Sequence, residues 1–323
     1  MIGRGKRGLV SRYTALVIVT LVIVSGVVGY YVLDQPGKSS SSSSTFTRQS
    51  TADSVLAELA NVSPTTLTQV GFGAPGVVSP KPVDSMTPLS VNGKPEVLYV
   101  GAEYCPFCAA ERWAMIVALD KFGSFSGIAE VQSAPLPEAY PNTPTFTFRN
   151  ATYTSNYISF VSVEQQDRNH NRLQNVTDDQ TALIGLYDYG GFIPFVDYAN
   201  KFTQVGSQFQ PSVLTNANWT QVASQLNNAS SAYALSIDAA SNRIISAICK
   251  VDGGSPTSVC SQPFAATLNY VSSSRSGLSP VIATDVSLTG VALVFRRPVC
   301  ALGTTVPHSS ILSPERPVLV HAS

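Results

Sequence analysis

Residues 96–113 read EVLYVGAEYCPFCAAERW and decide the fold that we expect for this chain. Residues 96–102 form a short apolar run that predicts a β-strand. After Cys105 the apolar residues change to helical spacing, which predicts a helix that ends near Gly123, where a glycine cap fits. Cys105 and Cys108 therefore lie where a strand becomes a helix, with Cys105 at the first position of that helix.

The spacing of the two cysteines suits thiol–disulfide exchange. Cys105 and Cys108 can close a small disulfide ring, and the thiolate is the species that attacks a disulfide. Unpaired N–H groups and the dipole at a helix N-terminus favour a thiolate at Cys105, and Cys108, one turn further, can resolve a mixed disulfide. Pro106 fits the first helical turn. The same spacing also occurs in zinc sites and in inert structural disulfides, which stay open as alternatives.

The remaining cysteines and the histidines bear on those alternatives. A structural zinc site takes four ligands, but the other cysteines make no second close pair and the histidines are few and scattered. We expect no metal, and we expect His170 to be a solvated loop residue. Cys249 and Cys260 flank a turn-rich loop and predict a structural disulfide, with free thiols or a second redox pair as alternatives. Cys300 is then left unpaired.

Charge and hydropathy bear on partners and location. Formal charges balance to zero and only 12% of residues are charged, so nothing suggests a nucleic-acid partner. The uncharged apolar stretch from Thr14 to Leu33 is long enough to span a bilayer as a helix. Basic residues precede it, so the positive-inside rule predicts a cytoplasmic N-terminus and an extracytoplasmic main domain. A cleaved signal peptide is the alternative, but the run is long and no clear cleavage site follows it.

The chain is thus expected to contain five segments. They are a cytoplasmic N-terminus at 1–13, a transmembrane anchor at 14–33, a serine-rich linker at 34–50, a folded extracytoplasmic domain at 51–265 and a C-terminal tail of uncertain structure at 266–323. Further patterns predict helices at 51–60, 215–226 and 232–249, strands at 144–148, 157–163 and 195–198, and irregular structure at 61–94. We assign the tail no function.

The order of strand, Cys105-Pro106-Phe107-Cys108, helix, later strands and an Ile-Pro step resembles the thioredoxin-like fold. This resemblance implies an α/β domain with helical insertions or an extension. In that fold a cis proline faces the active cysteines, and the residue before it offers backbone hydrogen bonds to a bound substrate chain. Pro194 and Ile193 match those positions, and we expect the bond between them to be cis, with an ordinary trans proline as the alternative.

A more specific resemblance rests on residues 93–113, GKPEVLYVGAEYCPFCAAERW, and on residues 141–146, PNTPTF. They resemble the family called domain of unknown function 929, found in archaea and actinobacteria. That resemblance spans roughly residues 55–265 and brings no established reaction. Compared with thioredoxins, no histidine lies between the cysteines, and Tyr99 stands in place of a buried aspartate, which leaves the redox potential open. Glu103 and Glu111 flank the motif and either act on the thiols or are solvated.

Together these patterns predict a membrane-anchored, extracytoplasmic thiol/disulfide oxidoreductase. Cys105 attacks a substrate disulfide, or is attacked when oxidised, Cys108 resolves the mixed disulfide, and Ile193 with Pro194 orients the substrate. Protein thiols or disulfides of the cell envelope are the expected partners, no cofactor is required, and the electron partner stays open. The alternative is a redox-inactive thioredoxin-like binding or scaffold domain whose Cys105–Cys108 bond is fixed.

Overall fold

The computed structural model describes residues 52–71, 73, 78–83, 87–266 and 299–301. The chain divides into two units, Met1–Ser50 and Thr51–Ser323, and every described residue lies in the second. The predicted cytoplasmic segment, the anchor from Thr14 to Leu33 and the serine-rich linker all lie outside the described residues. Among the helices that are described, none combines the length and the apolar character that a membrane crossing requires.

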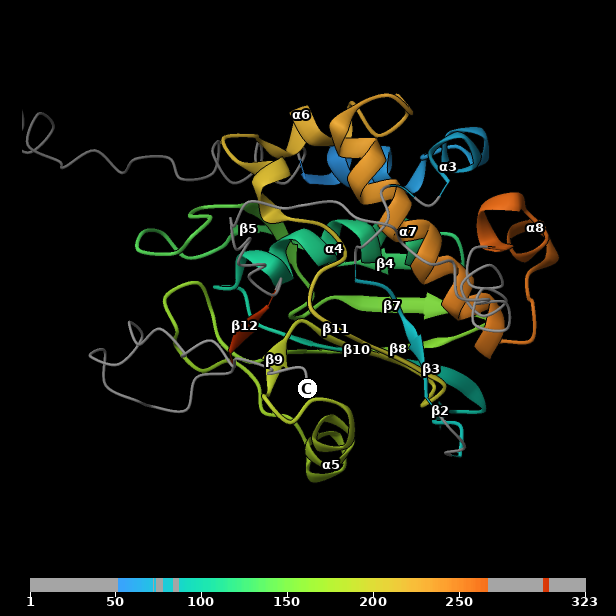
Figure 1. Cartoon of the computed structure of the whole chain (residues 1–323), viewed down its shortest axis with the longest axis horizontal. Coiled ribbons are helices and arrows are strands. Elements are labelled where there is room, and N and C mark those ends of the chain that lie inside the picture. The colour runs from blue at the N-terminus through green and yellow to red at the C-terminus, as the bar shows by residue number, and fades with distance from the viewer. Residues whose placement is uncertain (1–51, 72, 74–77, 84–86, 267–298, 302–323) are drawn as a thin grey trace, which may run out of the picture. The chain divides into compact units, whose positions relative to one another are not determined.

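A six-stranded mixed sheet lies at the centre of the domain (Figure 1). The strands follow the order β1 (Lys81–Pro82), β11 (Phe202–Val205), β10 (Phe195–Tyr198), β3 (Lys94–Gly101) and β2 (Ser90–Val91), and β8 (Ser159–Glu164) also pairs with β3. β3 runs parallel to β8 and antiparallel to β10 and β2, so it is the central strand. The domain is therefore mixed α/β, as the sequence predicts.

Alternate residues of β3 face opposite sides of the sheet, and helices cover both sides. Tyr99 packs in the main core with α4 (Pro106–Leu119) and α7 (Ala232–Val251). Leu98 packs on the other side with α5 (Asp178–Tyr187). Figure 1 accordingly shows α4 and α7 above the sheet and α5 below it. A strand covered on both faces needs a continuous apolar run, which explains the pattern of β3.

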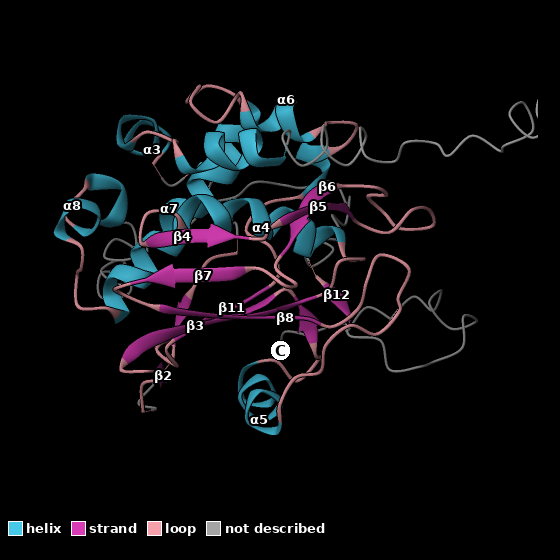
Figure 2. Ribbon diagram, turned by 180° about the vertical axis from the view of Figure 1, so that it is seen from behind, coloured by secondary structure: helices cyan, strands magenta, loops and turns pink. Residues whose placement is uncertain are grey.

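Shorter elements complete the domain. Two small antiparallel sheets join β4 (Gly123–Ser126) with β7 (Thr152–Ser155) and β5 (Ala129–Gln132) with β6 (Pro144–Thr147), on the α4 side of the main sheet (Figure 2). The other helical segments are residues 52–60, α3 (Pro64–Val70), α6 (Trp219–Ala223), α8 (Thr257–Cys260) and the 3-10 turns Pro211–Leu214 and Pro263–Ala266.

Several elements differ from their predictions. The helix predicted at 215–226 is confined to Trp219–Ala223. The helix after Cys105 ends at Leu119, and Gly123 begins β4 instead of capping the helix. A side chain at Gly123 would place its Cβ 2.3 Å from the carbonyl oxygen of Thr154, so glycine is needed there for the close approach of β4 and β7. Residues 61–94, expected to be irregular, contain α3, whose N-terminus is capped by the Ser63 side chain.

The turn that leads into β3 has its own local cause. Asn92 and Gly93 both have positive φ angles, 52° and 74°, and Val91 pairs with Lys94 across them. Asn-Gly with this geometry is the preferred two-residue turn of an antiparallel hairpin, because its twist matches that of the strands. The hairpin fixes the start of β3, and thereby the position of its far end.

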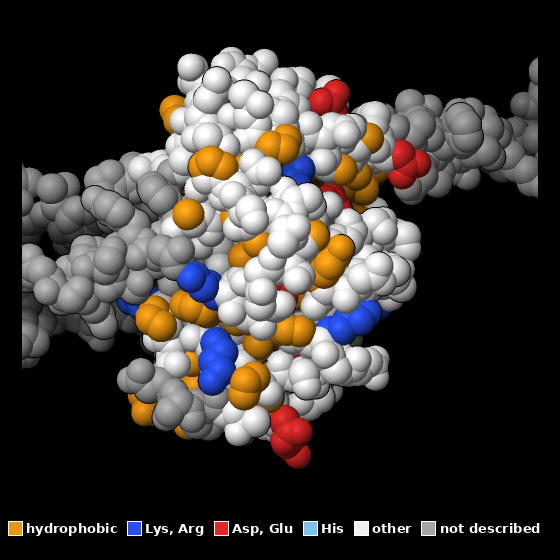
Figure 3. All heavy atoms as spheres, turned by 90° about the vertical axis from the view of Figure 1, so that its right-hand side faces the viewer, with side chains coloured by type: hydrophobic (Ala, Val, Ile, Leu, Met, Phe, Trp, Pro, Cys, Tyr) orange, Lys and Arg blue, Asp and Glu red, His pale blue; other side chains and the backbone are white. Residues whose placement is uncertain are grey.

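The surface reflects the low content of charged residues. Figure 3 views the side on which α8 lies in Figure 1. Lys and Arg side chains do not merge into one continuous patch on this face, and uncharged side chains lie between them (Figure 3).

Candidate functional site

Cys105 caps the N-terminus of α4. Its sulfur accepts a hydrogen bond from the backbone N–H of Cys108 at 3.4 Å, and Pro106 follows it at the start of the helix, where no N–H is needed. Because β3 ends at Gly101, only a short turn separates the central strand from this cap. The strand-to-helix placement predicted for Cys105 is therefore confirmed.

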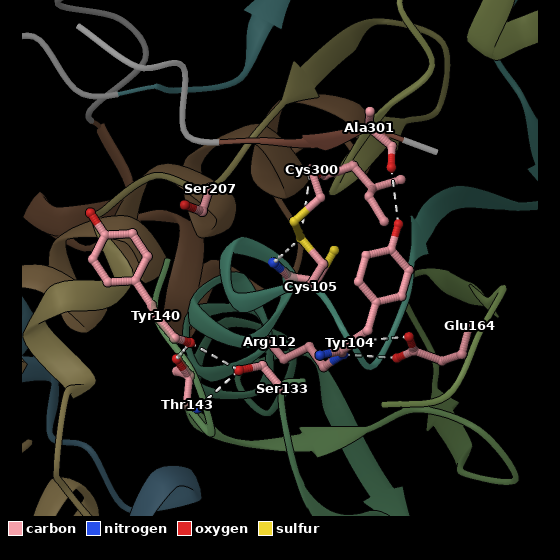
Figure 4. Close-up of a disulfide and its surroundings, with 12 residues drawn as sticks. Tyr104, Cys105, Arg112, Ser133, Tyr140, Thr143, Glu164, Ser207, Cys300 and Ala301 are labelled. Atoms are coloured by element: carbon pink, nitrogen blue, oxygen red, sulfur yellow. Dashed lines mark hydrogen bonds and ion pairs between the residues drawn. A yellow bond between two sulfur atoms is a disulfide. The ribbon is translucent and has the colours of Figure 1, made fainter. Parts of the chain in front are cut away.

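A neighbouring loop holds this turn in place. The Ser133 hydroxyl donates to the Tyr140 carbonyl oxygen at 3.2 Å and accepts the Thr143 N–H at 2.9 Å (Figure 4). The next residue, Ala134, donates its N–H to the Tyr104 carbonyl oxygen at 2.9 Å. Tyr104 immediately precedes Cys105, so the loop fixes the backbone from which the cysteine projects.

Cys105 is bonded to Cys300, which lies 195 positions away in the sequence (Figure 4). Cys300 begins β12 (Cys300–Ala301), a short strand that pairs antiparallel with β9 (Phe192–Ile193) and places Cys300 opposite Ile193. The prediction of an unpaired Cys300 is therefore wrong. Residues 300–301, which lie in the segment predicted as a tail of uncertain structure, pair with a strand of the domain. No local pattern reveals a pairing over such a distance.

Cys108 is the only one of the five cysteines that is not in a disulfide, and it is fully buried. Burial raises the pKa of its thiol to about 12, and the nearby positive charge of Arg112 opposes this shift. Cys108 is therefore a neutral thiol at physiological pH. The structure joins Cys105 to Cys300 and leaves Cys108 reduced, so it does not contain the fixed Cys105–Cys108 bond of the alternative prediction.

A buried ion pair lies beside Cys108. Arg112, one helical turn further along α4, donates to both carboxylate oxygens of Glu164 at 2.8 and 2.6 Å, and both side chains are fully buried (Figure 4). The arginine carbon Cζ also lies 5.7 Å from the centre of the Tyr99 ring. Sequence reasoning missed this pair. The four-residue spacing from Cys108 could have drawn attention to Arg112, whereas Glu164 reaches the site only through the pairing of β8 with β3.

The Tyr99 hydroxyl provides a polar group for Cys108. It is buried and has no hydrogen-bond partner among the described residues. It nevertheless lowers the pKa of the Cys108 thiol, because a hydroxyl can donate a hydrogen bond to the thiolate but gains little from the neutral thiol. Tyr99 therefore supplies a buried hydrogen-bond donor for the Cys108 thiolate.

Ile193 and Pro194 lie against the disulfide. The peptide bond between them is cis, the isomer expected from the sequence. The Cys105 sulfur is 3.9 Å from the Ile193 carbonyl oxygen, and since a disulfide sulfur carries no proton, this is a contact and not a hydrogen bond. Cys105, Cys108 and Ile193 share one buried apolar cluster. The fold thus brings together the residues predicted to react and the residue predicted to position a substrate.

Tyr104 and His170 cover one side of the site, and sequence reasoning assigned neither of them a role there. The Tyr104 hydroxyl donates to the Ala301 carbonyl oxygen at 3.0 Å (Figure 4). The His170 ring lies on the Tyr104 ring, with 4.2 Å between their centres. His170 is exposed, as predicted, but it also shields the tyrosine that holds β12.

The two flanking carboxylates are not solvated. Glu111 is fully buried and accepts hydrogen bonds from the backbone and side-chain amides of Gln208 at 2.9 and 3.2 Å. Glu103 is buried as well, and burial raises its pKa. The solvated alternative for these residues is wrong. Glu164 is the carboxylate that raises the pKa of Cys108.

The second predicted cysteine pair lies outside this cluster. Cys249, near the end of α7, and Cys260, at the end of α8, form a disulfide with a sequence separation of 11. Within the described part of the chain, no group of three or more His, Cys, Asp or Glu side chains is arranged to hold a metal ion.

Fold and site together define a mixed α/β domain with a buried cysteine centre at the N-terminus of a helix. Residues 83–186 match the model of the family described as Domain of unknown function (DUF929), which supports assignment to that family. The match is shorter than the span predicted from sequence, and it includes Cys105, Cys108 and Glu164 but ends before Ile193 and Cys300. No curated protein and no solved structure matches the chain.

Proposed function

We propose that this protein is a thiol/disulfide oxidoreductase that acts through Cys105 and Cys108. One observation carries the proposal: Cys105, the cap of a 14-residue helix, is disulfide-bonded to an extended segment that pairs with Ile193. A helix N-terminus stabilises a thiolate, and an extended segment beside the reactive sulfur is the form in which a protein substrate would bind.

The proposed chemistry consists of two exchanges. The Cys105 thiolate attacks a substrate disulfide, forms a mixed disulfide with one substrate sulfur and releases the other as a thiolate. The Cys108 thiolate then attacks the Cys105 sulfur, so that a Cys105–Cys108 disulfide forms and the reduced substrate leaves. The reverse sequence oxidises a substrate dithiol. No cofactor takes part, because both electrons stay on sulfur throughout.

The finer fold assignment, a thioredoxin-like domain with helical extensions, is part of this proposal. It is supported by the central strand β3 that leads directly into Cys105, by the cis bond before Pro194 and by helices on both faces of the sheet. These features agree with the sequence resemblance in their order along the chain.

We place the domain outside the cytoplasm, on a single membrane anchor from Thr14 to Leu33. The uncharged run with basic residues before it supports this topology. The two disulfides also favour an oxidising compartment. The proposed substrates are accordingly protein thiols or disulfides of the cell envelope.

A redox-inactive binding or scaffold domain is the second candidate. The full burial of Cys105 and its bond to Cys300 favour it, because buried structural disulfides exchange slowly. The free thiol of Cys108 beside that bond favours the oxidoreductase, since a purely structural disulfide needs no resolving cysteine.

The deciding experiment traps mixed disulfides. In the double variant Cys108→Ala/Cys300→Ser, Cys105 keeps its thiol but loses both partners within the site, so an oxidoreductase accumulates disulfide-linked complexes with envelope proteins. The matched control, Cys105→Ser/Cys300→Ser, retains Cys108 and gives none. If the first variant also forms no complex, and Cys105 in Cys300→Ser never exchanges in graded dithiol buffers, the scaffold function replaces the oxidoreductase.

A further inference from the structure

The segment Cys300–Ala301 is held in the site by three separate contacts. Its backbone pairs with β9 so that Cys300 lies opposite Ile193, and the Tyr104 hydroxyl donates to the Ala301 carbonyl oxygen at 3.0 Å. The third contact is the disulfide to Cys105 (Figure 4). A bound peptide substrate would need the same three contacts. Its backbone would pair with β9, a carbonyl oxygen would accept a side-chain hydrogen bond, and its cysteine would lie at the reactive sulfur.

Burial makes access to the bond asymmetric. Cys105 has no exposed surface, whereas Cys300 is only partly buried. An external thiol therefore cannot reach the Cys105 sulfur while the segment is in place. Cys108 approaches from inside, since it lies one turn further on α4, is fully buried and donates its N–H to that sulfur at 3.4 Å.

We propose that Cys300 is a third redox cysteine, which acts as an internal substrate and closes the site to external ones; this inference rests on the function proposed for Cys105 and Cys108. The closed form contains the Cys105–Cys300 disulfide. The open form contains the Cys105–Cys108 disulfide, and in it Cys300 carries a free thiol.

The two forms interconvert by one exchange. The Cys108 thiol loses its proton, and the thiolate attacks the Cys105 sulfur. The Cys105–Cys108 bond forms as the Cys105–Cys300 bond breaks, and Cys300 leaves as a thiolate that takes up a proton. One disulfide and one thiol are present before and after, so no external oxidant or reductant is needed.

The consequence is competition between Cys300 and outside substrates. A group tethered to the same chain acts at an effective concentration on the order of millimolar. External thiols at lower concentration therefore lose to Cys300 unless they bind the site more tightly. A protein segment that forms the same backbone pairing with β9 and accepts the hydrogen bond from Tyr104 can displace it, whereas a small thiol lacks these contacts.

The first test maps disulfides in the oxidised full-length chain without any substitution. Free thiols are alkylated at acidic pH after incubation at a series of higher pH values, and the linked peptides are identified by mass spectrometry. We expect both the Cys105–Cys300 and the Cys105–Cys108 pairs in native protein. The inference is overturned if Cys105–Cys300 is the sole linkage of Cys105 under every native condition.

The second test measures how fast reduced glutathione opens the disulfide of Cys105. We expect Cys300→Ser to react about tenfold faster than the wild type, because the tethered competitor is gone. The matched control, Cys249→Ser/Cys260→Ser, also lacks one disulfide but keeps the site, and should react at the wild-type rate. Circular dichroism checks that each variant is folded.

The outcomes separate the two proposals. If Cys300→Ser forms Cys105–Cys108 and reacts at the wild-type rate, the oxidoreductase function stands and the competition by Cys300 is refuted. If the folded variant forms no Cys105–Cys108 disulfide and does not exchange with glutathione, the proposed function itself fails.

Discussion

Arg112 and Glu164 form a bidentate ion pair inside the protein, with N–O distances of 2.8 and 2.6 Å and no exposure of either side chain. The pair joins α4, which begins at Cys105, to β8, which lies beside β3. It therefore connects the helix of the cysteine centre to the sheet, and it places one positive and one negative charge close enough to Cys108 to act on its thiol.

We expect loss of either partner to be costly. Arg112→Met or Glu164→Gln should lower the free energy of unfolding by about 3–5 kcal/mol, because an uncompensated charge stays buried. The double variant Arg112→Met/Glu164→Gln should be destabilised by less than the sum of the single effects, since neither charge remains. Urea unfolding of the four proteins measures this coupling. Strictly additive effects would show that the two side chains act independently.

The resolving step should accelerate with pH. Burial raises the pKa of the Cys108 thiol to about 12, so its thiolate fraction, and with it the rate of attack on Cys105, rises about tenfold for each pH unit below that value. The assay loads glutathione on Cys105 in the Cys300→Ser variant and follows its release. Cys108→Ala in the same background provides the zero-rate control. A release rate that levels off near neutral pH would contradict a strongly raised pKa.

Removal of the Tyr104 hydroxyl should weaken the attachment of β12 to the site. Tyr104→Phe deletes the hydrogen bond to Ala301, which contributes about 1 kcal/mol, so reduction of the Cys105–Cys300 bond by glutathione should become about fivefold faster. Tyr140→Phe is the matched control, because the Tyr140 ring contacts Phe107 and the backbone carbonyl of Tyr140, which the substitution keeps, accepts the hydrogen bonds from Ser133 and Thr143. Equal rates for the two variants would show that the hydroxyl does not hold the segment.

Asp238 on α7 should make stability depend on pH. Its side chain is fully buried, and neither carboxylate oxygen has a hydrogen-bond partner among the described residues. Burial raises its pKa to about 8, while Lys121 opposes the shift. The folded state therefore binds this proton more tightly than the unfolded state. The stabilisation is fully present below the ordinary pKa of aspartate and is lost as the pH rises through about 8.

Asp238→Asn should remove this part of the pH dependence. Near pH 9 we expect the variant to be more stable than the wild type by at least about 1 kcal/mol, because no charge is then buried. Urea unfolding at several pH values measures the effect. Asp179→Asn, at an exposed position of α5, serves as the control and should leave the slope unchanged. A wild-type stability that rises between neutral and alkaline pH would contradict the assignment.

The Cys249–Cys260 disulfide should affect stability and not exchange. Its short loop implies a loss of about 2–3 kcal/mol in the free energy of unfolding for Cys249→Ser/Cys260→Ser. The rate of glutathione reduction at Cys105 should stay the same, since the bond lies outside the cysteine cluster of the site. A slower rate at Cys105 in the folded variant would instead support the alternative of a second redox pair.

Local patterns determined the parts of this protein that depend on neighbouring residues. The strand before Cys105, the start of α4 and the helix at Ala232–Val251 follow from apolar periodicity and from capping within a few positions. The position of Cys105 at a strand-to-helix turn could therefore be predicted. The Ile193–Pro194 step was identified through a family resemblance, since no local pattern relates it to Cys105.

Only the tertiary structure decided which groups surround the cysteines. Glu164 reaches Arg112 because β8 pairs with β3 in one register. Cys300 reaches Cys105 because β12 pairs with β9 at Ile193, although residues 193 and 300 are 107 positions apart in the sequence. Sheet pairing joins segments of any separation, and it depends on the packing of the whole domain. For this reason the sequence identified Cys105 and Cys108, whereas the partner of Cys105 became evident only in the fold.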